Sequence, residues 1–144
     1  MPTTRRTRSV AAEPAAVWRT VSDPSHQPRW WPLVTRMEGV EPDAFTQLLS
    51  TSKGRNIRAD FRVVEFVEPS VYRYEQELAG SPFERILRHN EMTVELEPRG
   101  DGTTIALTRR TQLRGMSALG GFMWRRAAAR QLDEALDALE AIHG

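Results

Sequence analysis

Hydrophobic and polar residues alternate along most of the middle of the chain, a pattern typical of half-buried β-strands. Glycine, proline and other turn-forming residues separate the alternating runs at short intervals, which favours antiparallel hairpins. The pattern predicts six strands and, ahead of them, a seventh that begins the chain. Their expected ranges are 4–11 for the first strand and then 33–40, 44–51, 56–68, 71–79, 83–97 and 103–114.

Two short helices are expected between the first and second of these strands. An acidic residue precedes a proline at Glu13-Pro14 and again at Asp23-Pro24. Proline is well tolerated at the first helical position, because the N–H group that it lacks has no helical partner there. We expect Pro32 to end the second helix, since proline cannot continue a helix from within.

In the C-terminal segment, apolar residues no longer alternate with polar ones as they do in the predicted strands. Apolar residues recur there every three or four positions, and no proline interrupts the run from Ser117 to Ile142. This spacing predicts one long amphipathic helix with Ser117 as its N-cap. The helix needs an apolar partner, and only the sheet offers one. We therefore expect an α+β fold in which a curved seven-stranded sheet wraps the helix and leaves a gap between them.

Composition narrows the possible functions. The 144 residues are 40% hydrophobic with no cysteine, so disulfides, thiolate metal sites and a cysteine nucleophile are excluded. The formal net charge is only +1, which argues against nucleic-acid binding. No apolar run approaches the roughly 18 residues of a membrane span, and no secretory signal is evident. We expect a single domain over residues 1–144, in the cytoplasm, without stable membrane insertion, and as a monomer or homodimer.

Four stretches carry a resemblance to a known group of proteins. They are residues 12–18 (AEPAAVW), 21–24 (VSDP), 29–32 (RWWP) and 93–98 (TVELEP) with Gly102-Thr103 after them. In this order of elements the chain resembles the START-like, or SRPBCC, superfamily of helix-grip proteins, and within it the polyketide cyclase/dehydrase-like group. The resemblance covers nearly the whole chain.

The resemblance implies a cavity between the sheet and the long helix, closed at one end by the short helices. It also implies a hydrophobic ligand that is polyketide-, aromatic- or lipid-like, and an aldol-type cyclisation and dehydration if the protein is an enzyme. Two alternatives remain open: a non-enzymatic carrier of lipids or hydrophobic metabolites, and a regulatory module whose groove holds a protein partner. No cofactor is implied.

Strand alternation identifies which side chains should face such a cavity. Arg88, Arg109 and Tyr74 have inward parity and are the candidate catalytic residues, the arginines for oxyanion stabilisation and the tyrosine for proton donation. A β-bulge would reverse the parity and place both arginines in solvent. The candidate ligand-binding residues are Trp31, Phe61, Tyr72, Gln76, Asn90, Met92 and Thr111.

Three further features have competing interpretations. We expect Trp31 to point inward and Trp30 to lie nearer the surface, although at least one of them could simply complete the core. His26, His89 and His143 lack the short spacings of metal ligands, so we expect surface histidines and no metal site. The apolar and basic stretch 116–126 fits either a lid or membrane contact, or a helix start packed on the sheet.

Overall fold

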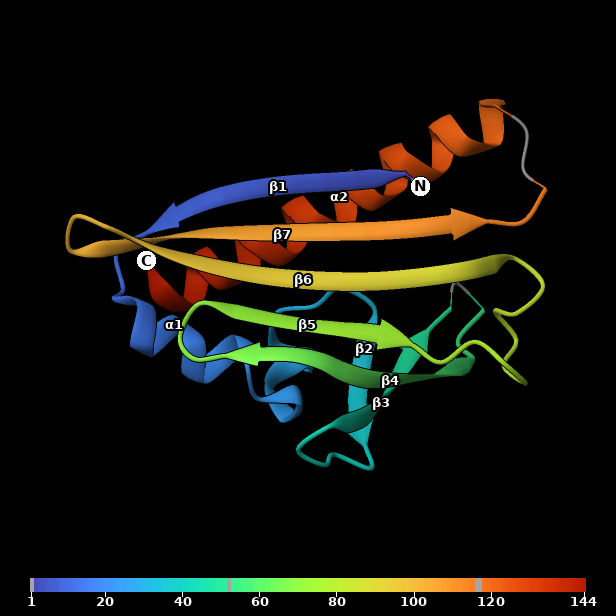
Figure 1. Cartoon of the computed structure of the whole chain (residues 1–144), viewed down its shortest axis with the longest axis horizontal. Helices are drawn as coiled ribbons and strands as arrows, with labels where there is room; N and C mark the ends of the chain where they lie inside the picture. The colour runs from blue at the N-terminus through green and yellow to red at the C-terminus, as the bar shows by residue number, and fades with distance from the viewer. Residues whose placement is uncertain (1, 52, 116–117) are drawn as a thin grey trace.

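Seven antiparallel strands form one curved sheet in the order β1-β7-β6-β5-β4-β3-β2 (Figure 1). The computed structural model describes residues 2–51, 53–115 and 118–144. Apart from β1 and its partner β7, sheet neighbours are consecutive in the chain, which confirms the predicted meander. The strands are β1 (Thr3–Val10), β2 (Val34–Glu38), β3 (Ala44–Ser50), β4 (Asn56–Val67), β5 (Val71–Gln76), β6 (Leu87–Arg99) and β7 (Gly102–Leu113).

Two short helices connect β1 to β2, as expected. The α-helix α1 (Pro14–Val21) has proline in its first turn, and the 3₁₀-helix η1 (Pro24–Arg29) follows it. The Asp23 carboxylate accepts a hydrogen bond from the backbone N–H of Ser25 and so caps η1. The expected end at Pro32 is wrong, because η1 stops at Arg29. Pro28 inside η1 lacks the N–H that a longer helix would use.

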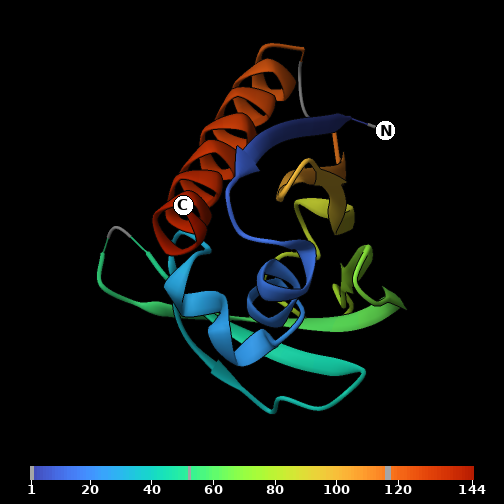
Figure 2. The same cartoon turned by 90° about the vertical axis from the view of Figure 1, so that its left-hand side faces the viewer.

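The C-terminal helix α2 (Ala118–His143) lies on the concave side of the sheet (Figures 1 and 2). Its apolar stripe is fully buried and consists of Ala128, Leu132, Ala135, Leu136 and Leu139. Arg8 of β1 forms ion pairs with Asp137 and Glu140, at 2.9 and 3.1 Å, on the side of the helix nearest β1. The proposed cap, Ser117, lies outside the described residues. No described helix combines the length and apolarity that crossing a bilayer requires.

The core joins the sheet, α1 and α2, with aromatic rings at its centre. Tyr72, Tyr74 and Phe45 are all at most 2% exposed. Trp30 belongs to this core at 2% exposure, whereas Trp31 is only partly buried. The expectation that Trp30 lies nearer the surface is therefore wrong. The two indoles meet edge to face, with ring centroids 5.8 Å apart, so Trp30 fills the interior and supports Trp31.

Strand β6 starts later than predicted. The sequence pattern placed its beginning at residue 83, but residues 77–86 form a turn-rich segment in which the backbone N–H groups of Ser81 and Ile86 bond to the carbonyls of Leu78 and Phe83. A register shift against β7 follows between Leu87 and His89. Such an irregularity turns side chains to the opposite face of the strand. Leu87 is therefore buried and Arg88 is exposed.

Candidate functional site

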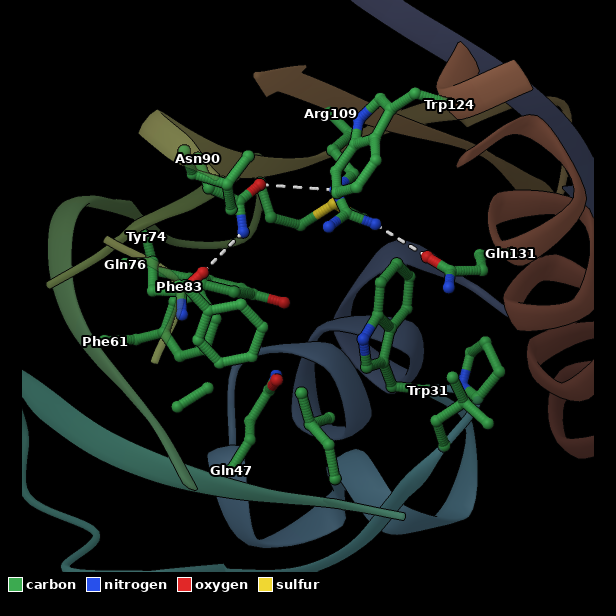
Figure 3. Close-up of a pocket in the computed structure, with 16 residues that line it drawn as sticks. Trp31, Gln47, Phe61, Tyr74, Gln76, Phe83, Asn90, Arg109, Trp124 and Gln131 are labelled. Carbon is green, nitrogen blue, oxygen red and sulfur yellow. Dashed lines mark hydrogen bonds between the residues drawn. The ribbon is translucent and has the colours of Figure 1, made fainter. Parts of the chain in front are cut away.

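A pocket lies between the concave face of the sheet and α2, with a volume of about 100 Å³ (Figure 3). Every strand from β3 to β7 contributes to it, together with α2, the segment 77–86 and the residues after η1. Most of the wall is apolar, formed by Trp31, Pro32, Leu33, Leu49, Ala59, Phe61, Phe83, Leu87 and Met92. The remaining lining residues bring polar groups and are Gln47, Tyr74, Gln76, Asn90, Arg109, Trp124 and Gln131.

Four of the polar residues form a hydrogen-bonded chain across the pocket (Figure 3). Asn90 Nδ2 donates to Gln76 Oε1 at 2.8 Å. Arg109 Nε donates to Asn90 Oδ1 at 3.2 Å, and Arg109 Nη1 donates to Gln131 Oε1 at 2.6 Å. The chain thus runs from β5 through β6 and β7 to α2, and it fixes the guanidinium between sheet and helix.

Arg109 has no acidic partner among the described residues. Both its hydrogen bonds go to neutral amide oxygens, and its guanidinium lies 5.7 Å from the centre of the Trp124 ring. The side chain reaches deep into the protein while keeping part of its surface open to the pocket. Burial lowers the pKa of Arg109, because desolvation disfavours the charged form. The group nevertheless stays a cation at neutral pH.

Two polar groups in the pocket are buried without a hydrogen-bond partner in the described structure. They are the Tyr74 hydroxyl and Gln76 Nε2, on side chains that are 2% and 9% exposed. Figure 3 shows the Tyr74 hydroxyl directed into the pocket. Burial raises the pKa of Tyr74, so the phenol keeps its proton and remains a hydrogen-bond donor. Buried polar groups nearly always have a hydrogen-bond partner, so the lack of one at Tyr74 and Gln76 is unusual.

The structure brings together seven of the ten residues selected from sequence. Trp31, Phe61, Tyr74, Gln76, Asn90, Met92 and Arg109 all line the pocket. Three do not line it. Tyr72 packs edge to face against Trp18 in the core, at 6.3 Å between ring centroids. Thr111 is buried, and its hydroxyl accepts a hydrogen bond from Trp124 Nε1 at 3.1 Å.

The structure contradicts the expected position of the Arg88 side chain. Its expected inward orientation is wrong, because the register shift at the start of β6 turns it into solvent. The β-bulge therefore reverses the orientation of Arg88 and leaves that of Arg109 unchanged. Arg109 sits in the regular part of β7, opposite Met92, and keeps the inward parity of Ile105 and Leu107.

Several lining residues were not found from sequence. Trp124 and Gln131 are seven positions apart on α2, which places them on one face of the helix. Gln47 has the inward parity of Phe45, and its amide donates to Gln27 Oε1 at 2.6 Å. Gln131 and Gln47 are each a polar residue on an otherwise apolar face, and this contrast could have identified them from sequence. Leu87 gave no such signal, because its orientation depends on the bulge.

Among the described lining residues there is no carboxylate, histidine or lysine. The pocket can therefore donate hydrogen bonds and stabilise negative charge, but it offers no side chain able to remove a proton near neutral pH. What it provides is an apolar hollow with a positively charged, donor-rich end.

None of the three histidines lines the pocket; each lies at the surface with a partly exposed side chain, 35% exposed in His26 and 28% in His89. His143 Nε2 lies 2.9 Å from Thr20 Oγ1, and His26 Nδ1 lies 3.2 Å from the carbonyl of Arg19. His89 lies with Glu75 and Glu91 on the other face of the sheet, within 4.8 Å by their potential ligand atoms. Arg73 binds Glu91 at 3.2 Å there, so the cluster is an ion-pair network.

Comparison with known proteins agrees with this geometry. A family model described as "Polyketide cyclase / dehydrase and lipid transport" matches residues 1–144. A search of curated protein sequences gives no match. A START superfamily protein from Mycobacterium smegmatis has 18% identity and a TM-score of 0.80, with 98% of this chain and 96% of that chain covered.

Two other solved structures are similar. A protein from Thermobifida fusca has 25% identity and a TM-score of 0.77, covering 100% of this chain and 94% of its own. The di-domain ARO/CYC StfQ of the steffimycin biosynthetic pathway has 16% identity and a TM-score of 0.78, covering 98% of this chain and 50% of its own. The full-length family match leads to one conclusion: the chain belongs to the polyketide cyclase/dehydrase and lipid transport family, and its fold is that of the START superfamily protein.

Proposed function

We propose that this protein binds a small hydrophobic molecule in the pocket between sheet and α2, with a polar group of the ligand at the Arg109 end. One observation carries the proposal: an apolar hollow in which unpaired buried donors converge, as in ligand sites generally. The family membership supports a hydrophobic ligand in the same place.

The size of the pocket limits the ligand. About 100 Å³ is well below the roughly 300–1,000 Å³ of sites for drug-sized molecules. It is closer to an engineered cavity of about 150 Å³ that holds benzene. A one-ring compound therefore fits the pocket best. A polycyclic polyketide or a long acyl chain needs more room, which displacement of Phe83 or Trp124 at the rim would supply.

A cyclase is the second candidate, supported by the similarity to the ARO/CYC structure and by the donors around Arg109. In an aldol-type closure, Arg109 would stabilise the developing oxyanion and Tyr74 would donate a proton. Such an enzyme also needs a base to form the enolate. Since no described lining residue supplies one, binding without chemistry, as in a carrier, accounts for the pocket more completely.

A pocket-filling variant tests the binding proposal. Ala59 is 1% exposed and lines the pocket, so Ala59→Met places a flexible side chain in the hollow. We expect affinity for one-ring probes such as benzyl alcohol and benzoate to fall at least tenfold, as measured by NMR chemical-shift titration. The variant should still fold, because overpacking of this kind costs about 1–3 kcal/mol.

Ala127→Met on the exposed face of α2 is the matched control and should bind as the wild type does. Equal affinities in Ala59→Met and wild type would place the bound probe somewhere other than this pocket.

A further inference from the structure

We infer that the natural ligand is an organic anion, of the carboxylate class, whose charged group pairs with Arg109 while its apolar body occupies the rest of the pocket. This inference rests on the proposed function, because it assigns the chemical class of the molecule bound at the same site.

The first argument is uncompensated charge. A buried guanidinium is costly unless a negative charge accompanies it. Other arginines of the structure have such partners: Arg8 meets Asp137 and Glu140, and Arg73 meets Glu65 and Glu91. Arg109 lies deeper than these, and its described partners are all neutral: the side-chain oxygens of Asn90 and Gln131 and the ring of Trp124. The missing negative charge is therefore expected from outside the chain.

The second argument is the direction of the hydrogen bonds. Within the chain from Gln76 to Gln131, every side-chain oxygen already accepts a bond: Gln76 Oε1 from Asn90, and Asn90 Oδ1 and Gln131 Oε1 from Arg109. Two buried groups of the pocket have no partner in the described structure: Gln76 Nε2, which can only donate, and the Tyr74 hydroxyl, which is able to donate. A ligand group that accepts hydrogen bonds can satisfy both, whereas a group that only donates leaves Gln76 Nε2 without a partner.

A carboxylate meets both requirements at once. It carries the missing charge, has two oxygens with about four acceptor sites, and donates nothing when ionised. Its hydrogen bonds to a guanidinium are charge-assisted and therefore stronger than bonds between neutral groups. A ketone, ester or amide could satisfy the free donors, but it would leave Arg109 buried without a counter-charge.

Charged residues near the pocket also favour an anionic ligand. Phe83 and Trp124 line the pocket from residues 77–86 and the first turns of α2, and both segments lie toward the same end of the sheet as the β3–β4 turn (Figure 1). The β3–β4 turn, residues 77–86, the end of β7 and the first turns of α2 carry several exposed basic side chains and two acidic ones. The basic residues are Lys53, Arg55, Arg85, Arg114, Arg125 and Arg126, and the acidic ones are Glu77 and Glu84. Since the whole chain is only +1, this end is locally positive, which favours the approach of an anion.

Benzoate and benzamide provide the test, because they have nearly the same shape and differ in charge. We expect wild-type protein to bind benzoate at least tenfold more tightly than benzamide, measured by titration calorimetry and NMR. In Arg109→Met this preference should disappear, with benzamide affinity changing little. Arg88→Met removes an exposed arginine outside the pocket and should keep the full preference.

The outcomes separate the two claims. If benzamide binds in the pocket as tightly as benzoate or more tightly, the anion inference is overturned and the proposed binding function stands. If wild-type protein binds neither benzoate nor benzamide in the pocket, the proposed function fails and the inference fails with it. The wild-type comparison decides between these results even if Arg109→Met does not fold.

Discussion

Buried amides link the short helices to the sheet at the scale of single residues. Gln27 of η1 and Gln47 of β3 are 0% and 2% exposed, and their side chains meet at 2.6 Å. The bond holds η1 against the strand that forms one wall of the pocket. One amide group, Gln27 Nε2, has no partner in the described structure even so. The pair thus positions η1, but it leaves the buried Gln27 Nε2 without a hydrogen bond, which is destabilising.

Removing one member of this pair should be worse than removing both. We predict that Gln47→Leu lowers the free energy of unfolding by about 1–3 kcal/mol, because Gln27 is then buried without any partner. The double variant Gln27→Leu/Gln47→Leu should lose less than the sum of the two single variants. Urea denaturation of the four proteins measures this coupling. Strictly additive losses would mean that the two amides do not stabilise each other.

Parity along the strands located most of the candidate site from sequence. Tyr74, Gln76, Asn90 and Arg109 follow the alternation set by apolar neighbours such as Val94 and Leu107, and they line the pocket as expected. Arg88 was misplaced because one irregular residue pair in β6 reverses the alternation, and nothing in the composition of that stretch marks it. The order of the two indoles was also misjudged, since adjacent tryptophans look alike to a pattern of hydrophobicity.

At the scale of elements, the pairing of β1 with β7 adds the edge strand that lies along α2. Gly102 begins β7, one position before Thr103, which pairs with Val10 at the end of β1, and a Cβ atom on Gly102 would collide with the carbonyl oxygen of Val10. Only glycine therefore allows the strands to approach so closely. Gly121, in the early turns of α2, has no neighbouring atom within 4 Å of such a Cβ position. The two glycines have opposite roles in stability.

Alanine substitutions should show this contrast. We expect Gly121→Ala to raise the free energy of unfolding by about 0.5–1 kcal/mol, because glycine is entropically costly inside a helix. Gly102→Ala should lower it by about 1–3 kcal/mol, since the β1–β7 pairing has to shift to relieve the clash. Thermal and urea unfolding of both variants provide the measurement. A loss in Gly121→Ala comparable to that in Gly102→Ala would contradict the assignment.

At the scale of the whole molecule, the order of elements was predictable because each carries its own periodicity. Seven alternating runs, two proline-initiated helices and one long 3.6-residue period are local signals, and together they favour the helix-grip arrangement. The volume of the hollow was not predictable. It depends on how far α2 stands from the concave face, and side chains such as Trp124, Gln131 and Phe83 determine the space that remains.

The central claim is that this hollow admits a guest molecule, and the position of a bound probe tests it most directly. Nuclear Overhauser effects between the ring protons of benzoate and the methyl groups of Met92 and Leu87 would place the probe between sheet and helix. We predict these contacts in the wild type and their loss in Ala59→Met. Contacts confined to exposed side chains such as Met123 or Val67, with none to Met92 or Leu87, would contradict the account.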